Sequence, residues 1–380
     1  MSRPPNVFLR SGLVIGFAAL FSSASIAQTV NNGGFEFKNG KEIFEAACIN
    51  CHGPEGQGMP KTTVGFEAPS TFPDFTDCKG TSPEDNATWR TIITNGGPGR
   101  GFSPIMPSFS EALTPQQINM VIEYLRSFCK EPVWPRGELN LPRALVTEKA
   151  FPENEVILTT AVNAKGAPGI SNEFSYERRI GARNQIEVSV PFSFERLSPG
   201  SWFGGIGDTG LGLKRVLFSS LNSGSIFSVQ GEAILPTGNR LKGAGSGVTT
   251  FETFGAFGQL FPRYTFLQLQ GGADLPVDTS VAPRSLFLNA AVGKSFTGKG
   301  SLGRWWTPMF EVVGDRDLVN GAVTNWDVIP EMQVTLSKRQ HIRADLGVRV
   351  PVNNTRDRPV QIMFYVLWDW FDGSLKEGWK

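Results

Sequence analysis

The chain has 380 residues, which is long enough for two domains that each bury a core. Lys and Arg number 36 against 35 Asp and Glu, so no basic field indicates nucleic acid and no acidic tail indicates a disordered arm. The 43 glycines and 29 phenylalanines, with only 19% charged residues, favour strands and turns over a helical bundle.

Residues 1–27 have the pattern of a secretory signal peptide. Arg3 and Arg10 make a positive first region, residues 13–21 form a short apolar run, and Ser25-Ile26-Ala27 is a small-residue cleavage site. The apolar run is about half of the ~20 residues that a membrane-spanning helix requires, which disfavours an N-terminal membrane anchor. The pattern therefore predicts an exported protein that begins at Gln28.

Cys48-Ile49-Asn50-Cys51-His52 is the attachment pattern of c-type haem. Two thiols at this spacing can form thioethers to the two vinyl groups of one haem, and the adjacent histidine can bind the iron. Zinc and redox dithiol sites share the CxxC part, but zinc would need two further ligands and a redox dithiol a βαβ unit. We therefore predict one covalent haem c, with Cys48 and Cys51 as tethers and His52 as an iron ligand.

Helical periodicity surrounds this motif. Residues 41–51 carry apolar side chains at helical spacing, and residues 115–128 predict an amphipathic helix that Thr114 caps. The stretch from about Gly40 to Lys130 resembles a class I cytochrome c, through "GKEIFEAACINCHGPEGQG", "IMPSF" and "LTPQQINMVIEYLRSF". The resemblance implies a small all-α cytochrome c domain over residues 28–130.

Met106, in "SPIMPSF", matches the position of the distal iron ligand in that family. A thioether suits an electron-transfer haem, because His/Met ligation raises its reduction potential. Met59 is too close to His52 in sequence to reach the opposite haem face, and Met120 lies within the last predicted helix, where core packing explains it. His341 is the chain's other imidazole and is a rival only if the second domain covers the haem. A plain core methionine is the alternative for Met106.

Cys78 and Cys129 remain after haem attachment. In an oxidising compartment an even pair favours a disulfide, which would join the loop at "FTDCKG" to the end of the last helix. Two separate free thiols are the alternative.

Residues 131–154 hold several prolines and no sustained period, so they predict an extended, proline-rich linker. Beyond it the apolar period changes from 3.6 to 2, as in "HIRADLGVRV", where Leu346 and Val348 alternate with Asp345 and Arg349. About twelve such strands, many near ten residues long, follow within residues 155–380. Strands this long and numerous predict an all-β antiparallel barrel, because closure removes the edges that would mispair.

The alternation alone leaves open which face of the barrel is apolar, since a soluble barrel turns that face inward and a membrane barrel turns it outward. Strand length, an even strand number and aromatic residues near strand ends favour the membrane. These aromatic residues are Trp305, Trp306, Trp368, Trp370 and Phe371.

The second region also resembles the outer-membrane barrels of the transport-like family associated with aromatic-degradation operons, through "NQIEVSVPF", "GIGDTGLGLK" and "GEAILPTG". This resemblance implies the fold more than a substrate. The chain departs from it by continuing past Phe371 as "DGSLKEGWK", where many such barrels end on an aromatic residue. Gly205–Gly210 also fits the GxGxxG pattern of dinucleotide sites, but a strand follows it and no βαβ unit surrounds it.

Together these patterns predict an electron carrier rather than an enzyme. The cytochrome domain is expected in the periplasm, where it exchanges electrons with soluble redox proteins, and the barrel is expected in the outer membrane. Two alternatives stay open: a cytochrome subunit that serves a dehydrogenase or oxidase, and a transport channel with a redox-responsive cytochrome domain. The sequence indicates neither the electron donor nor the acceptor.

Overall fold

The computed structural model describes residues 36–59, 65, 67–69, 71–198, 201–240, 243–298, 302–356 and 358–370. The predicted signal peptide over residues 1–27 lies outside the described residues, as does the C-terminal stretch from Phe371.

The first part of the described chain is helical. Its elements are α1 (Gly40–Ala47), α2 (Ile49–His52), α3 (Cys78–Thr81), α4 (Asn86–Asn95), η1 (Gly97–Arg100) and α5 (Pro115–Arg126). None of the helices in the described residues is long and apolar enough to cross a membrane.

Helix α5 begins as the sequence predicts and supplies the centre of the helical core. Thr114 accepts a hydrogen bond from the Gln117 backbone, and the Gln117 side chain accepts one from the Thr114 N–H, which completes a capping box. The apolar face of α5 packs against Phe44 of α1 in one buried cluster. Gly40 lies at the crossing of the two helices, where an added Cβ would come within 1.9 Å of the Met120 carbonyl oxygen. A glycine therefore allows α1 and α5 to approach closely.

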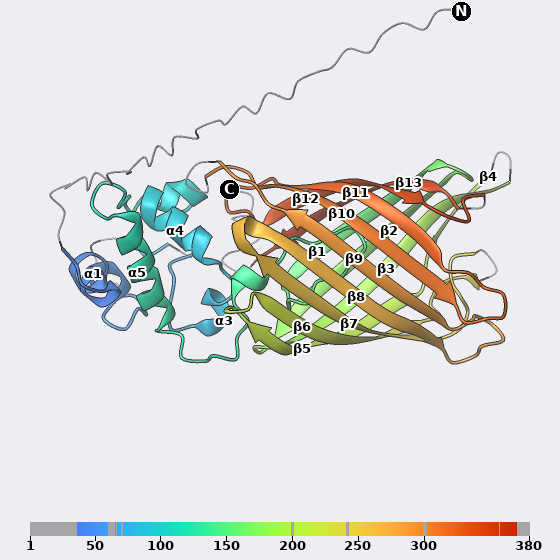
Figure 1. Cartoon of the computed structure of the whole chain (residues 1–380), viewed down its shortest axis with the longest axis horizontal. Helices are drawn as coiled ribbons and strands as arrows, with labels where there is room; N and C mark the ends of the chain where they lie inside the picture. The colour runs from blue at the N-terminus through green and yellow to red at the C-terminus, as the bar shows by residue number, and fades with distance from the viewer. Residues whose placement is uncertain are drawn as a thin grey trace, which may run out of the picture. The chain divides into compact units, whose positions relative to one another are not determined.

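The second part of the chain is one antiparallel sheet (Figure 1). Its strands are β1 (Glu155–Lys165), β2 (Gly169–Ile180), β3 (Asn184–Ser198), β4 (Ser201–Ile206), β5 (Thr209–Ser220), β6 (Ser225–Leu235), β7 (Thr250–Phe261), β8 (Thr265–Pro276), β9 (Ser285–Lys294), β10 (Trp306–Asp317), β11 (Asn325–Thr335), β12 (Ile342–Pro351) and β13 (Val360–Asp369).

The sheet closes into a barrel, because β1 pairs with β2 on one side and with β13 on the other. Strands β4 and β5 both pair with β3, at successive stretches of it, and act as one barrel strand interrupted at Gly207-Asp208. The 13 named strands of the described residues therefore make a barrel of twelve. This confirms the expected antiparallel barrel and its strand number.

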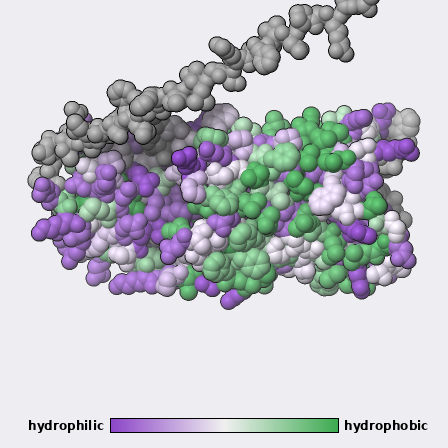
Figure 2. All heavy atoms as spheres, in the orientation of Figure 1, coloured by the Kyte–Doolittle hydropathy of each residue, from purple (hydrophilic) through white to green (hydrophobic). Residues whose placement is uncertain are grey.

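The apolar face of the barrel points outward and the polar face points inward. On β12, the side chain of Leu346 is 58% exposed, whereas that of the adjacent Asp345 is only 2% exposed. The same alternation holds on β11, where Met332 is exposed and Glu331 and Gln333 are buried. Figure 2 shows hydrophobic residues over much of the barrel wall. The structure thus selects the outward-apolar arrangement that the sequence left open.

The barrel interior holds the stretch of residues 139–153, called here the internal segment. It is irregular after the short helix η2 (Gly137–Leu139) and ends just before β1. Its apolar side chains pack in three buried clusters against inward-facing residues of widely separated strands: Leu145 meets Val313 of β10, Phe151 meets Val216 of β5, and Leu141 meets Phe266 of β8. A segment that reaches strands all around the wall must lie within the lumen.

Ion pairs hold the internal segment as well. Arg143 lies 2.8 Å from Glu177 of β2 and 3.2 Å from Glu155 of β1, and the Lys149 ammonium is bonded to Glu153. All of these side chains are buried, and buried charges are tolerated only when they are paired. The sequence predicted an extended, proline-rich linker over residues 131–154, whereas residues 139–153 are packed inside the barrel, because their apolar side chains are buried against its strands.

Candidate functional site

A cavity of about 570 Å³ in the helical domain brings together the four residues that the sequence analysis assigned to haem: Cys48, Cys51, His52 and Met106. Most of its other lining residues are apolar or aromatic. Its size falls within the range of about 300–1,000 Å³ that is typical of ligand pockets. Residues some 55 positions apart in sequence thus meet at one site.

The local backbone positions the two thiols and the imidazole. The Cys48 N–H donates to Phe44 O at 2.9 Å, which continues α1, and the His52 N–H donates to Cys48 O at 2.9 Å, which forms the single turn of α2. Gly53 then ends the turn with φ +75°, and an added Cβ there would lie 2.5 Å from Gly58 O. Gly53 therefore ends α2 in a backbone conformation that other residues rarely adopt.

The His52 ring lies in an aromatic environment. Its centroid is 5.1 Å from that of Phe72, in a stacked arrangement, and 5.1 Å from that of Phe75. Burial lowers the pKa of His52 to about 4, because the apolar surroundings disfavour the imidazolium. The ring is therefore neutral at physiological pH, which is the form that binds iron. Its Nδ1 is buried and makes no hydrogen bond within the described residues.

The two thiols also fit covalent attachment. Cys48 and Cys51 are free and only partly buried. Burial, with a smaller effect of neighbouring Cys51, raises the pKa of the Cys48 thiol to about 11. Both sulfurs line the cavity beside a neutral imidazole and apolar walls, so the site fits a haem held by two thioethers and one histidine.

Met106 is fixed on the cavity wall by two glycines. The Gly97 N–H donates to Met106 O at 3.0 Å, and an added Cβ at Gly96 would lie 2.9 Å from the same oxygen. Among the methionines of the described residues, Met106 lines the cavity, whereas Met59 and Met120 do not. His341 lies in the connection between β11 and β12, where its Nδ1 is bonded to the Asp369 carboxylate, and it does not line the cavity. The geometry therefore favours Met106 over the other candidates for the distal ligand.

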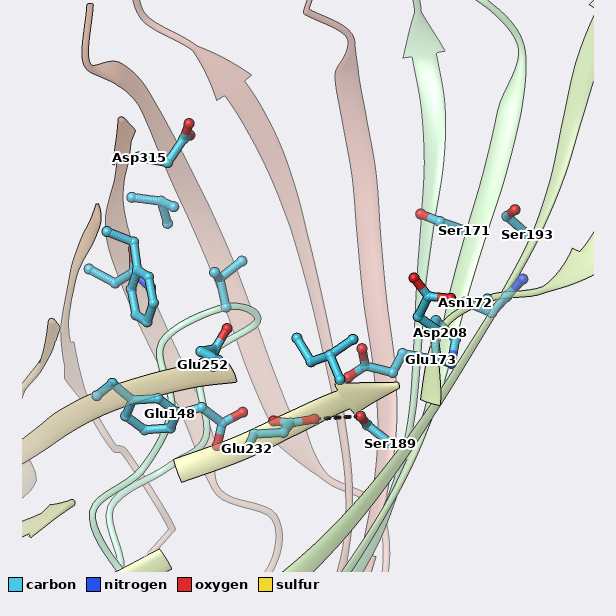
Figure 3. A pocket seen from close by; sticks show the side chains of 18 of the residues that line it. Glu148, Ser171, Asn172, Glu173, Ser189, Ser193, Asp208, Glu232, Glu252 and Asp315 are labelled. Atoms are coloured by element: carbon cyan, nitrogen blue, oxygen red, sulfur yellow. Dashed lines mark hydrogen bonds between the residues drawn. The ribbon is translucent and has the colours of Figure 1, made fainter. Parts of the chain in front are cut away.

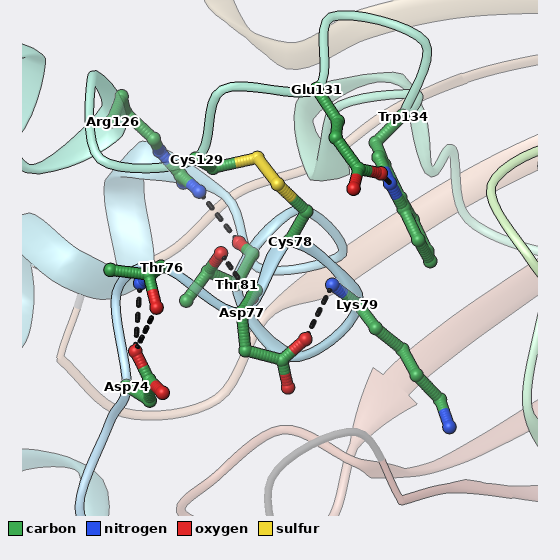
Figure 4. The surroundings of a disulfide bond; sticks show 10 residues. All are labelled: Asp74, Thr76, Asp77, Cys78, Lys79, Thr81, Arg126, Cys129, Glu131 and Trp134. Carbon is green, nitrogen blue, oxygen red and sulfur yellow. Dashed lines mark hydrogen bonds between the residues drawn. A yellow bond between two sulfur atoms is a disulfide. The ribbon is translucent and has the colours of Figure 1, made fainter. Parts of the chain in front are cut away.

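A disulfide joins Cys78 and Cys129 near this site (Figure 4). Cys78 is the first residue of α3, which Asp77 caps by accepting a hydrogen bond from the Lys79 N–H. Arg126, near the end of α5, donates to Thr81 O at 2.6 Å and so ties the same two segments together. The bridge links the loop that precedes α4 to the end of α5, as the sequence analysis expected.

The aromatic wall is the part of the site that the sequence analysis missed. Phe75 contacts Trp89 edge to face at 5.4 Å, and the Arg126 guanidinium lies 3.6 Å from the centre of a Trp89 ring. Burial is the main cause that lowers the pKa of Arg126, to about 10. Phe72 and Phe75 belong to the irregular stretch "STFPDF", so no helical or strand period could have marked them.

Comparison with protein families matches the model described as "Cytochrome c" to residues 37–128. The matched range includes α1 to α5 and all the lining residues of the cavity described above. Comparison with curated proteins gives no significant match.

The solved structures similar to this chain include two porins and an outer membrane channel. The KdgM porin is 9% identical, with a TM-score of 0.40 over 57% of this chain and 99% of that one. An outer membrane channel from Pseudomonas putida F1 is 12% identical, with a TM-score of 0.40 over 60% of this chain and 100% of that one. The NanC porin is 6% identical, with a TM-score of 0.40 over 57% of this chain and 98% of that one.

Proposed function

We propose that this protein is an electron carrier with one haem c, attached through Cys48 and Cys51 and ligated by His52 and Met106. The observation that carries the proposal is the shared cavity, in which two free thiols, a neutral imidazole and a thioether face one apolar volume. Soft thioether and imidazole ligands are those of electron-transfer haems.

A bound haem would supply reversible one-electron chemistry at its iron. The protein's own residues supply the rest. Cys48 and Cys51 hold the group in place, and burial keeps the His52 nitrogen unprotonated. The Phe72 and Phe75 rings exclude water from the imidazole, and an apolar, water-poor surrounding tunes the reduction potential.

The barrel is proposed to anchor this carrier in an outer membrane. Its outward side chains are apolar on strands all around the wall, including Phe174, Leu213, Leu288 and Leu346, which water would not favour. In such barrels the turns on the periplasmic side are short and the loops on the outer side are longer. Here the turns at residues 181–183, 221–224 and 262–264 are short and the loop at 236–249 on the other side is long. The exceptions are the longer loop 295–305 on the first side and the short turn 166–168 on the other.

These loop lengths support the proposal that the start of β1, and the cytochrome domain that precedes it, face the periplasm. The cytochrome domain is expected outside the lumen for a second reason. A compact domain of about 90 residues has a radius of gyration of about 12 Å and is therefore about 30 Å across. The lumen of a twelve-stranded barrel is narrow and already holds the internal segment. Soluble periplasmic redox proteins are therefore the proposed partners, and a wide transport pore is the less favoured alternative.

The first test separates membranes and stains for covalent haem. Full-length protein should migrate with outer membranes and carry the stain, and a Cys48→Ser/Cys51→Ser variant should reach the same fraction without it. Haem stain in the soluble fraction alone would contradict the membrane anchor. An unstained wild type would contradict the carrier.

The second test concerns the distal ligand. Met106→Ala should keep the haem but lose the thioether-to-iron charge-transfer band and lower the reduction potential, because the sixth ligand is gone. Met120→Ala is the matched control, since Met120 packs in the same core but does not line the cavity. A Met106→Ala protein with an intact band would refute the assignment.

A further inference from the structure

A second cavity, here called the chamber, has a volume of about 680 Å³ and lies inside the barrel (Figure 3). Val146 and Glu148 of the internal segment form part of its wall, and side chains from β2, β3 and β6 to β10 form most of the remainder. Asp208 and Asp315 line it near the interrupted strand and the end of β10. The chamber is separate from the haem cavity, and nothing in electron transfer requires it.

The chamber is strongly acidic. Its wall carries five glutamates on five different elements: Glu148, Glu173, Glu187, Glu232 and Glu252. Glu232 and Glu252 are directly opposite each other in the β6–β7 register, and Glu252 is directly opposite Asp274 in the β7–β8 register. Like charges in directly opposed positions destabilise a sheet. A bound cation would offset this cost.

The barrel's own cations compensate this charge only in part. Lys214 lies 3.7 Å from Glu148, and Arg143 is shared between Glu148 and the buried Glu155 and Glu177. Arg349, which also lines the chamber, lies 2.6 Å from Asp327. Among the described residues, no Lys or Arg forms an ion pair with the four wall glutamates that come from β2, β3, β6 and β7.

Two buried amides add acceptor oxygens to this wall. The Gln230 amide nitrogen donates to Glu187 at 3.0 Å, and the Asn289 amide nitrogen donates to Gln270 at 2.9 Å. Their carbonyl oxygens, Oε1 of Gln230 and Oδ1 of Asn289, have no hydrogen-bond partner in the described part of the chain. Both residues line the chamber and are only 5% exposed. Buried acceptors without a donor are costly, so they indicate an occupant that donates hydrogen bonds.

Gly210 of β5 leaves space for the side chains of Ser189 and Glu232, which lie on the two neighbouring strands. Ser189 of β3 donates to Glu232 of β6 at 2.9 Å, across the intervening strand. An added Cβ at Gly210 would lie 1.6 Å from the Glu232 carboxylate oxygen and 2.2 Å from Ser189 Oγ. Gly210 ends the GxGxxG pattern that lacks the βαβ unit of a dinucleotide site, and its structural role is to let side chains of two strands meet over a third.

Part of the remaining wall is apolar, which favours a cation that also carries hydrocarbon. Val146, Ile234, Phe254 and Phe287 line the chamber, and the rings of Phe254 and Phe287 lie 6.2 Å apart. Within the described residues, no three His, Cys, Asp or Glu side chains converge closely enough to hold a metal ion. Dispersed carboxylates between apolar surfaces fit an elongated occupant whose charges are separated by hydrocarbon.

We propose that the chamber binds a linear aliphatic di- or polyammonium solute. Its ammonium groups would donate charge-assisted hydrogen bonds to the glutamates and to the free amide oxygens. Its methylene groups would pack on Phe254 and Phe287, whose ring faces also attract an adjacent cation.

Equilibrium dialysis of labelled spermidine against the full-length, haem-loaded protein in detergent tests this. Saturable binding is expected, and Glu232→Gln and Glu173→Gln should each weaken it about tenfold, because each removes one charge-assisted hydrogen bond. Glu195→Gln is the matched control, since Glu195 is exposed on β3 and does not line the chamber. Circular dichroism of each variant checks that the barrel has formed.

Five outcomes would overturn the proposal. They are the absence of saturable spermidine binding, an equal loss in the Glu195→Gln control, unchanged binding in both chamber variants with native circular dichroism, competition by adipate, and displacement of spermidine by equimolar Mg²⁺. The last outcome would show a nonspecific cation chamber without a preference for hydrocarbon. Adipate, a dianion of similar length, should not compete, and competition by it would equally refute the charge assignment.

Discussion

Glu311 of β10 is the main acceptor that holds the internal segment to the barrel wall. Its buried carboxylate accepts hydrogen bonds from the Val146 N–H at 3.0 Å, the Thr147 N–H at 2.7 Å and the Thr147 hydroxyl at 2.6 Å. Replacing Glu311 with leucine keeps a side chain of similar size but removes all three acceptor contacts. The substitution should therefore loosen the internal segment without removing a barrel strand.

The expected change in the free energy of local opening follows from the two backbone amides that lose their acceptor, those of Val146 and Thr147. A buried N–H that loses its partner costs about 1–3 kcal/mol, so two amides should lower the free energy of local opening by about 2–6 kcal/mol. The lower figure corresponds to about a 30-fold shift in the opening equilibrium. Glu311→Gln should have a smaller effect, because its amide oxygen can still accept both hydrogen bonds from Thr147.

Hydrogen–deuterium exchange followed by mass spectrometry measures this opening. The peptide that contains Val146 and Thr147 should exchange about 30-fold faster or more in Glu311→Leu, and by a smaller factor in Glu311→Gln. Glu195→Leu, at an exposed site on β3, should leave that peptide unchanged. Wild-type exchange in Glu311→Leu would show that these hydrogen bonds do not hold the segment in place.

Two further predictions concern the cytochrome domain. Exported protein that is denatured without reductant should show no alkylation at Cys78 or Cys129, and two adducts before reduction would refute the bridge. Replacing both cysteines with serine should lower the free energy of unfolding of the domain by about 4 kcal/mol, because the bridge closes a loop of 51 residues. In haem-free Cys48→Ser/Cys51→Ser protein, the unfolded chain binds a proton at His52 between pH 6.5 and about 4, whereas the folded chain does not. The free energy of unfolding should therefore fall as pH drops through this range, as measured by amide exchange in α1 and α2. His52→Gln should make this free energy less dependent on pH, and an unchanged slope in that variant would contradict the effect of His52 burial.

The sequence alone determined the features that depend on near neighbours. The spacing of Cys48, Cys51 and His52 is a covalent requirement of haem attachment, so the pattern could be recognised without the fold. Thr114 and the apolar stripe after it determined α5, because capping and amphipathicity act within a few residues. Alternation of period 2 likewise determined the strands and their approximate number.

The tertiary structure decided what depends on contacts between distant residues. Alternation gives each strand two faces but does not say which one the closed barrel encloses. Only the closed barrel, in which β1 pairs with β13, shows that Asp345 faces inward and Leu346 outward. The internal segment has no period of its own, and its position depends on partners such as Glu311, more than 160 residues away. The need for a glycine at position 210 follows from the contact between Ser189 and Glu232 above it, which exists only in the closed barrel. Local preferences are encoded over a few residues, whereas the polarity of a lumen and the residues that fill it arise only when all strands close.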